Sequence, residues 1–192
     1  MEAEAEFAEA LAKLRQGDET AAAWMVERFG PELRRVIRLR LTDPFLRRLV
    51  DSSDIQQSVF ANFFVRAALG QYELEEPRNL ISLLVTMARN KVINLARDNK
   101  KEKSARNSPE APAPLEEIGD RTIDAGTDVA DLVQKARKLL SADEAKLVEE
   151  RLGGKSWQDI AASRGEQPDA CRKQYRRALD RVAEQLGLTE TP

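Results

Sequence analysis

Residues 156–182 read "SWQDIAASRGEQPDACRKQYRRALDRV", and this stretch predicts two helices joined by a tight turn. Ser156 stands three residues before Asp159, which is a capping-box pattern that begins a helix. Gly165 can adopt the positive φ that a turn requires, and Pro168 fits the first turn of the next helix. The stretch therefore predicts a helical hairpin with helices over about 156–164 and 168–186.

The second of these helices has two chemically different faces. One face is apolar and is expected to pack inward; it carries Cys171, Tyr175, Ala178, Leu179 and Val182. The other face is charged; it carries Asp169, Arg172, Lys173, Arg176 and Arg177. A helix-turn-helix motif places such a face in the major groove of DNA, whereas an ordinary helical hairpin exposes it to water. The small residue Ala161 at the helix crossing and Gly165 in the turn favour the DNA-binding interpretation.

A second basic helix is predicted upstream, where residues 83–106 read "LLVTMARNKVINLARDNKKEKSAR". The apolar side chains of this region share one face: Ile81, Leu84, Val85, Ala88, Val92 and Leu95. The opposite ridge carries amides and cations: Asn90, Asn94, Arg97 and Lys101. Amides can hydrogen-bond base edges and cations can hold phosphates, so this ridge is a second candidate DNA-binding surface. The alternative is a solvent-exposed helix face on which cations happen to cluster.

The formal net charge of −2 hides an uneven distribution of charge along the chain. Cations cluster over 89–106 and again over 172–181, and a mostly acidic stretch over 110–131 separates the two clusters. For a nucleic-acid partner, the distribution of charge matters more than its sum. The two basic clusters coincide with the two candidate DNA-binding helices.

The composition excludes several classes of enzyme. The 192 residues include no histidine, so a Ser-His-Asp or Cys-His nucleophile pair and an imidazole metal ligand are absent. No Gly-rich phosphate loop occurs. The single cysteine, Cys171, lies at an inward helix position without partner ligands, which indicates core packing. We expect no enzyme activity, no cofactor and no metal site.

The sequence predicts a cytoplasmic protein without a membrane partner. No apolar run approaches the roughly 20 residues that a membrane span needs. The first residues, "MEAEAEFAEA", lack the basic start of a secretory signal. One cysteine also rules out an internal disulfide.

The rest of the chain shows helical periodicity and no strand pattern, which predicts an all-α fold. Pro31 is expected to begin a new helix that runs to Leu41, and residues 52–69 are expected to form a helix that ends at Gly70. From Ser104 to Gly126 the periodicity stops, and Pro, Ala and acidic residues indicate an extended flexible linker. We therefore expect two small helical domains, 1–104 and 127–192, joined by a linker over 105–126.

Three segments, in order, resemble motifs of extracytoplasmic-function (ECF) sigma factors, the two-domain branch of the sigma-70 family. "DSSDIQQSVFANFFVRA" (51–67) resembles region 2.2, and "MARNKVINLARDNKK" (87–101) resembles regions 2.3 and 2.4. "GGKSWQDIAASRGEQPDACRKQYRRALDRV" (153–182) resembles region 4.2. The resemblance spans nearly the whole chain, and the 51–67 segment is similar to sigma factors of planctomycete-type bacteria. It implies a sigma region 2 domain, a linker and a sigma region 4 helix-turn-helix domain.

The resemblance also implies three binding surfaces. Docking on the β′ clamp helices of the RNA polymerase core is expected of Asp51, Asp54, Gln57 and Phe60. Contact with the −10 promoter element is expected of Asn90, Asn94, Arg97 and Lys101, together with a base-capturing loop that carries Tyr72, Glu75 and Arg78. Contact with the −35 element is expected of Asp169, Arg172, Lys173, Arg176 and Arg177. The β flap of the polymerase is a further expected partner.

Such a protein hydrolyses no nucleotide, so the energy that opens the promoter DNA strands must come from binding. Flipping a base costs a few kcal/mol, and a stacked aromatic returns on the order of 1–3 kcal/mol per base. Tyr72 is the one evident aromatic residue in and around the predicted loop. We therefore expect weak promoter melting and strict promoter choice.

The chain departs from the family pattern at three places. Ser53 stands where the family usually has Glu, Ala170-Cys171 stands where it often has Thr-Val, and Gln174 stands where it usually has Arg. The last two departures fall in the helix that is expected to contact the −35 element.

Ser53 also suggests regulation. A Ser/Thr kinase that acts on Ser52, Ser53 or Ser58 would add about −1.5 to −2 charges beside the acidic docking surface. The simpler interpretation is that these serines cap the helix. An anti-sigma factor is another expected partner. The acidic linker is expected to be a solvated spacer, with folding back onto a basic helix as the alternative.

Two other functions remain open from the sequence. One is a dimeric helix-turn-helix regulator that binds operators without polymerase, although no dimer seam is evident and "DSSDIQQSVF" would have no role in it. The other is an interaction protein whose basic faces bind acidic partners.

Overall fold

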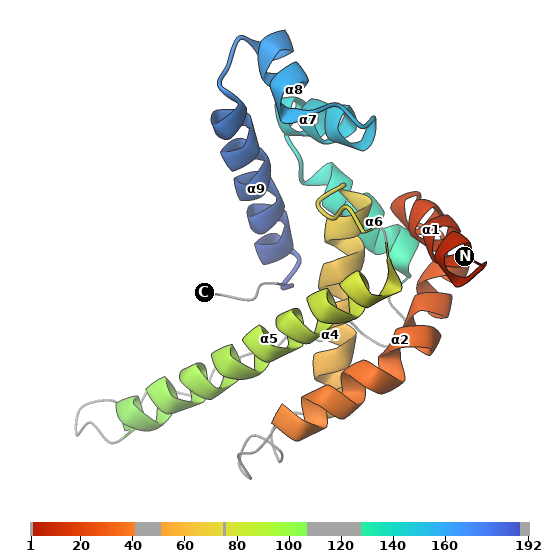
Figure 1. The fold of residues 1–192 in the computed structure, drawn as a ribbon. Coiled ribbons are helices and arrows are strands. Elements are labelled where there is room, and N and C mark those ends of the chain that lie inside the picture. Colours follow the sequence, from red (N-terminus) through yellow and green to blue (C-terminus); the bar gives the residue numbers. More distant parts are fainter. Residues whose placement is uncertain (1, 41–50, 75, 107–127, 189–192) are drawn as a thin grey trace.

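The structure, a computed structural model, describes residues 2–40, 51–74, 76–106 and 128–188. Within these ranges the regular elements are α-helices and there is no strand, which confirms the predicted all-α fold (Figure 1). The helices are α1 (Glu2–Arg15), α2 (Glu19–Arg40), α4 (Ser52–Ala68), α5 (Pro77–Arg106), α6 (Val129–Lys138), α7 (Ala142–Leu152), α8 (Trp157–Arg164) and α9 (Pro168–Gln185).

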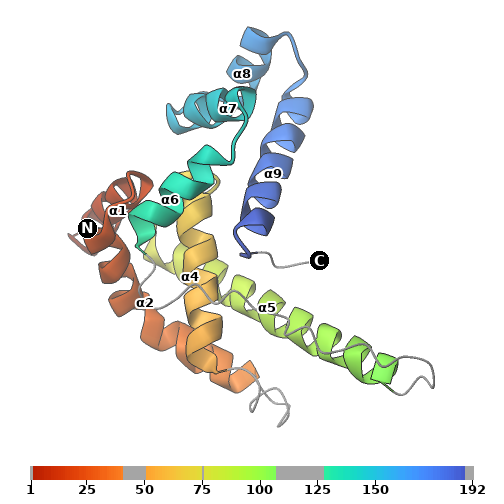
Figure 2. The same ribbon diagram turned by 180° about the vertical axis from the view of Figure 1, so that it is seen from behind.

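The N-terminal module consists of α1, α2, α4 and α5, which pack around one aliphatic and aromatic core. Phe7 of α1 meets Phe29 of α2 edge to face, with the ring centroids 6.1 Å apart. Phe63 of α4 and Leu84 of α5 are buried in the same core. In both views α5 extends as a long arm beyond the other helices (Figures 1 and 2).

One helix boundary that the sequence predicts is wrong. Pro31 was expected to begin a new helix, but α2 continues through it from Glu19 to Arg40. Proline in a helix interior removes one backbone hydrogen bond, which normally favours a break. Here Phe29, Leu33 and Ile37 are all buried on one stripe that spans the proline, so packing against α4 and α5 holds α2 continuous.

α4 lies at the centre of the molecule and is buried on two sides. Toward the N-terminal core it presents Ile55, Val59 and Phe63, which belong to the cluster shared with α1, α2 and α5. Toward the other side it presents Ala61 and Val65, which belong to a second cluster shared with α6–α9. A helix that is apolar around most of its circumference is typical of such a central position.

The C-terminal module consists of α6–α9 and follows the local signals closely. The predicted capping box of Ser156 with Asp159 forms before α8, and a second one, of Ser141 with Glu144, forms before α7. Gly165 adopts a φ of 67° after α8. The predicted helices over 156–164 and 168–186 are confirmed to within one residue at each end.

The second hydrophobic cluster joins the two modules. It combines Ala61, Val65 and Leu69, from α4 and its C-terminal end, with side chains of α6–α9. The predicted linker, 105–126, lies from residue 107 onward outside the described residues, and α5 includes its first two positions. The described C-terminal module packs directly on α4.

Candidate nucleic-acid interface

The two faces of α9 are arranged as its sequence predicts. All five inward positions are buried: Cys171, Tyr175, Ala178, Leu179 and Val182. All five charged positions are exposed: Asp169, Arg172, Lys173, Arg176 and Arg177. Arg172 lies 3.8 Å from Asp169 and also covers the Trp157 ring at 5.9 Å. A row of cations on an exposed recognition helix is suited to phosphates and base edges.

α9 is held in place by polar contacts with α7. The Gln174 amide donates to the Asp143 carboxylate at 2.9 Å, and Asp143 also pairs with Arg164 of α8. Arg181 donates to the Leu139 carbonyl at 3.0 Å. Gln174, one of the departures from the family pattern, therefore contacts α7 within its own module in this structure. Burial, together with the nearby Glu166 carboxylate, raises the pKa of the Cys171 thiol, which fits its predicted place in the core.

The outer ridge of α5 is also accessible where it is described. Asn90 and Arg97 are exposed and Asn94 is half-buried, whereas Leu84, Ala88 and Val92 on the opposite face are buried. The side chain of Lys101 lies outside the described residues. The predicted amphipathic division of this helix is therefore confirmed over its described part.

The predicted base-capturing loop precedes α5. The Tyr72 ring is stacked on Phe63 of the N-terminal core, with centroids 5.8 Å apart and the planes 15° from parallel. The Tyr72 carbonyl accepts a hydrogen bond from Arg15 at 3.2 Å, a contact that the sequence did not indicate. Arg78 is exposed and pairs with Glu76, and Glu75 lies outside the described residues. One face of the Tyr72 ring is thus packed on the protein, and the residue is half-buried.

The N-terminal end of α4 forms an acidic ridge. Asp51 is the N-cap residue, and its carboxylate accepts from the Ser53 backbone N–H at 3.2 Å, which lowers the pKa of Asp51. Asp54 and Gln57 are partly exposed. Phe60 is only 3% exposed and packs on Phe64, so its side chain belongs to the core and supports the ridge from beneath.

Gln56 makes a buried polar contact between two helices that sequence reasoning missed. It is buried between α4 and α2, where its side-chain carbonyl accepts from Arg34 at 2.8 Å. Its amide nitrogen fills the space beside Gly30, 2.5 Å from where a Cβ would stand. Gln56 stands beside Gln57 and Ser58 between Ile55 and Val59, so nothing in the local sequence marks it as the polar residue that is buried.

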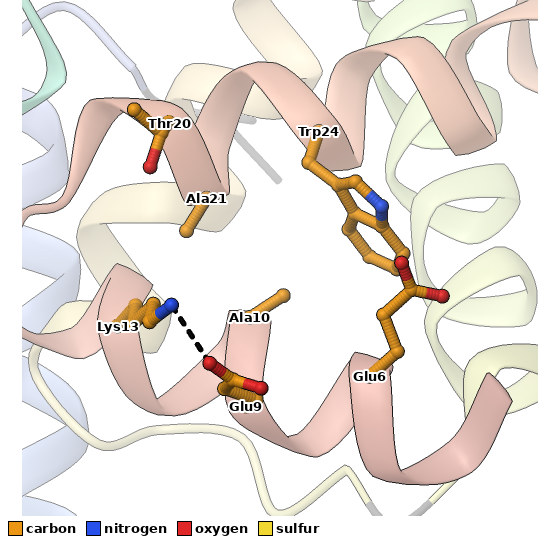
Figure 3. Close-up of a pocket in the computed structure, with 7 residues that line it drawn as sticks. All are labelled: Glu6, Glu9, Ala10, Lys13, Thr20, Ala21 and Trp24. Atoms are coloured by element: carbon orange, nitrogen blue, oxygen red, sulfur yellow. Dashed lines mark ion pairs between the residues drawn. The ribbon is translucent and has the colours of Figure 1, made fainter. Parts of the chain in front are cut away.

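A groove between α1 and α2 offers no comparable chemistry. Figure 3 shows its lining, which includes Glu6, Glu9, Lys13 and Trp24. Lys13 pairs with Glu9 at 2.7 Å, and this contact lowers the pKa of Glu9. Over the described ranges, no cluster of three or more acidic or cysteine side chains is arranged to hold a metal ion, and no helix is both long and apolar enough to cross a membrane.

Comparison with known proteins agrees with the motifs and the fold. The family model described as ECF sigma factor matches residues 4–187, which is nearly the whole chain. No curated protein and no solved structure matches it. A match of this extent covers both modules and all three candidate surfaces, and the chain therefore belongs to the ECF sigma factor family.

Proposed function

We propose that this sigma factor brings the RNA polymerase core to promoters by three separate surfaces. The acidic ridge at the start of α4, with Asp51, Asp54 and Gln57, docks on the β′ clamp helices. The outer ridge of α5 contacts the −10 element, and the charged face of α9 contacts the −35 element. The observation that carries this proposal is the complete separation of buried apolar and exposed cationic positions on α9.

The two DNA-binding ridges differ in chemistry in a way that suits the two elements. α9 exposes three arginines and a lysine, which suit the phosphates and guanine edges of an intact major groove. α5 exposes amides beside its cations, and amides can bond the edges of bases in separated strands. The α5 ridge is therefore assigned to the element that opens and the α9 ridge to the element that stays duplex.

Promoter melting by this chain is proposed to be weak. Flipping a base out of the duplex costs a few kcal/mol, and a pocket that binds the flipped base must offset this cost. Phe63 already covers one face of the half-buried Tyr72 ring, so this ring offers a base at most its other face. Transcription from promoters with altered −10 sequences tests this: strict loss of activity is expected, and broad tolerance would contradict it.

Ser53 is the position where a kinase has the best access to the acidic ridge. Ser53 is exposed, Ser52 is buried and Ser58 is half-buried. The N-cap role belongs to Asp51, although Ser52 also donates to the Asp51 carboxylate at 3.3 Å. A phosphate at Ser53 would lie in the first turn of α4, where the helix dipole favours negative charge. Equal binding of core polymerase by Ser53→Ala and Ser53→Glu would remove this regulatory proposal.

The test of the proposed function is run-off transcription with purified core polymerase, followed by mapping of the start sites. The expected result is a set of start sites that share two elements at a fixed spacing. An operator-binding regulator would bind DNA without polymerase and yield no transcript. An interaction protein would bind no promoter even with polymerase present.

A further inference from the structure

One edge of α9 is bonded at two points to the first turn of α7. At about 100° per residue, Gln174 and Arg181 lie within about 20° of each other around the α9 axis and about two turns apart. Both side chains are half-buried, since this edge lies between the buried apolar face of α9 and its exposed charged face. Their partners, Asp143 and Glu144, are neighbours at the start of α7.

The Asp143 carboxylate bonds one side chain from each of the other two helices around it. Its Oδ2 accepts from the Gln174 amide of α9 at 2.9 Å, and its Oδ1 accepts from the Arg164 guanidinium of α8. The Arg164 side chain is only 9% exposed, and it also lies 3.8 Å from Glu150 of α7 and 3.9 Å from Glu166 in the turn. One carboxylate therefore joins α7, α8 and α9.

Arg181 makes the second connection between α9 and α7. Its guanidinium donates to the Glu144 carboxylate at 2.5 Å and to the Leu139 carbonyl at 3.0 Å. The same Glu144 oxygen accepts from the Ser141 backbone N–H at 2.8 Å, as part of the capping box that begins α7. The start of α7 is thus fixed by its own cap, and α9 is bonded to that fixed turn.

These polar connections add direction to the packing of α9. Its inner face, with Tyr175, Leu179 and Val182, is buried in the second hydrophobic cluster. Hydrophobic burial is non-directional, whereas a hydrogen bond weakens steeply when its length or angle changes. Two bonded side chains about two turns apart on one edge therefore resist both a tilt of the helix and a slide along its axis.

Small movements of α9 matter because its charged face is the proposed −35 surface. α9 has 18 residues and is about 27 Å long, so a tilt of about 5° about its middle moves each end by about 1 Å. Groups that bind a partner must be held to within about 0.5 Å. Arg172 and Arg177 stand on either side of Gln174 along this helix, so a tilt displaces both from their contacts.

Gln174 is engaged by the protein in this structure. A glutamine can read an adenine edge, in which case its amide nitrogen donates to the base while its carbonyl accepts from it. Here the amide nitrogen donates to Asp143, and the side chain is half-buried against α7. A bidentate contact with a base would require the side chain to turn away from α7 and give up this bond.

We propose that Asp143 and Gln174 are positioning residues for the −35 contact, which act without touching the DNA. Their bond holds α9 at the angle at which the cations of its charged face reach the −35 element together. The inference rests on the proposed function, because it takes this charged face as the −35 surface. It makes recognition of the −35 element a property of three connected helices rather than of α9 alone.

The experiment uses the full-length chain with core polymerase, on a promoter obtained from the start-site mapping. The −35 base pairs are changed one at a time, and discrimination is the ratio of transcription from the original promoter to that from the changed one. Asp143→Ala and Gln174→Ala should each lower this ratio about 3- to 10-fold at several −35 positions. The double variant should lower it no further than either single one, because both changes remove the same bond.

Two further measurements separate positioning from a loss of folding and from direct reading of a base. Sensitivity to changes in the −10 element should be kept in all variants, which a misfolded chain would not show. A residue that reads DNA directly affects one base pair. If Gln174→Ala lost discrimination at a single −35 position while Asp143→Ala kept it, Gln174 would be a base reader and the inference would be overturned.

Two control variants test the bond itself. In Asp143→Asn, the new amide can donate to the Gln174 carbonyl after the Gln174 amide flips, so this variant should keep most of the discrimination that Asp143→Ala loses. Glu149→Ala removes an exposed carboxylate from the same helix and should behave as the wild type does. A wild-type protein indifferent to every −35 change would refute the −35 assignment. Discrimination that is normal in Asp143→Ala would refute the positioning role alone.

Discussion

Tyr175 links the hydrophobic core of the C-terminal module to the contact with α4. Its ring meets Trp157 edge to face at 5.3 Å, while its hydroxyl donates to the Leu69 carbonyl. Burial raises the pKa of this hydroxyl well above its usual range, so the group remains a donor at any physiological pH. The contact between the modules is thus insensitive to mild pH change.

The raised pKa of Tyr175 predicts a loss of stability at alkaline pH. The group keeps its proton in the folded state but releases it in the unfolded state above about pH 10. Its contribution to the free energy of unfolding is therefore complete below about pH 10 and falls as the pH rises further. Urea unfolding at a series of pH values from 8 to about 11 measures this. Tyr175→Phe should show a shallower decline than the wild type, and equal slopes would contradict the assignment.

Gln56 and Gly30 form a second residue-scale prediction. A methyl group at Gly30 would displace the buried Gln56 amide and break its bond with Arg34, although alanine is the better helix former. In Gln56→Ala, the space beside residue 30 is free. A double-mutant cycle of Gly30→Ala and Gln56→Ala should therefore show a coupling of about 1 kcal/mol or more in the free energy of unfolding. Additive effects of the two changes would mean that the side chains do not meet.

At the scale of elements, the sequence predicted those helices whose ends are marked by capping residues, a turn glycine or a proline. The hairpin of α8 and α9 was predictable because its helix ends are set by local residues. Ser156 and Asp159 cap the start of α8, Gly165 ends it, and Pro168 begins α9. The continuity of α2 could not be predicted in this way, because it depends on the packing of Phe29, Leu33 and Ile37 against α4 and α5. Local signals suffice only where no distant helix overrides them.

The continuous α2 helix makes a testable prediction at Pro31. Within an unbroken helix, Pro31→Ala restores a backbone hydrogen bond and should raise the free energy of unfolding by about 1–3 kcal/mol. At the first turn of a separate helix, proline is favourable, and the same change should bring no gain. Thermal or urea unfolding of the variant distinguishes the two. No gain, or a loss of stability, would favour the boundary that the sequence predicts.

At the scale of the whole molecule, the sequence predicted the surfaces better than their arrangement. The faces of α5 and α9 follow from helical periodicity, so the candidate DNA-binding residues were accessible to sequence reasoning. The contact between modules was not, because Ala61 and Val65 look the same as other apolar residues of α4 whichever module covers them. Tyr175 had a predictable inward position, but its partner, the Leu69 carbonyl, is 106 residues away.

Near this contact, residues of both modules line a common groove. Arg172 and Arg176 line one groove with Glu73 of the N-terminal module, whose carboxylate pairs with Arg151. α5, in contrast, extends away from the C-terminal module (Figure 2).

The assignment of one promoter element to each module is tested most directly by transcription from promoters altered at a single element. Wild-type protein with core polymerase should lose activity when either element is changed. Arg176→Ala should become indifferent to the −35 sequence and remain sensitive to the −10 sequence, while Asn90→Ala should show the reverse pattern. If both variants lost sensitivity to the same element, or if neither changed its preference, the two-module account of promoter recognition would be contradicted.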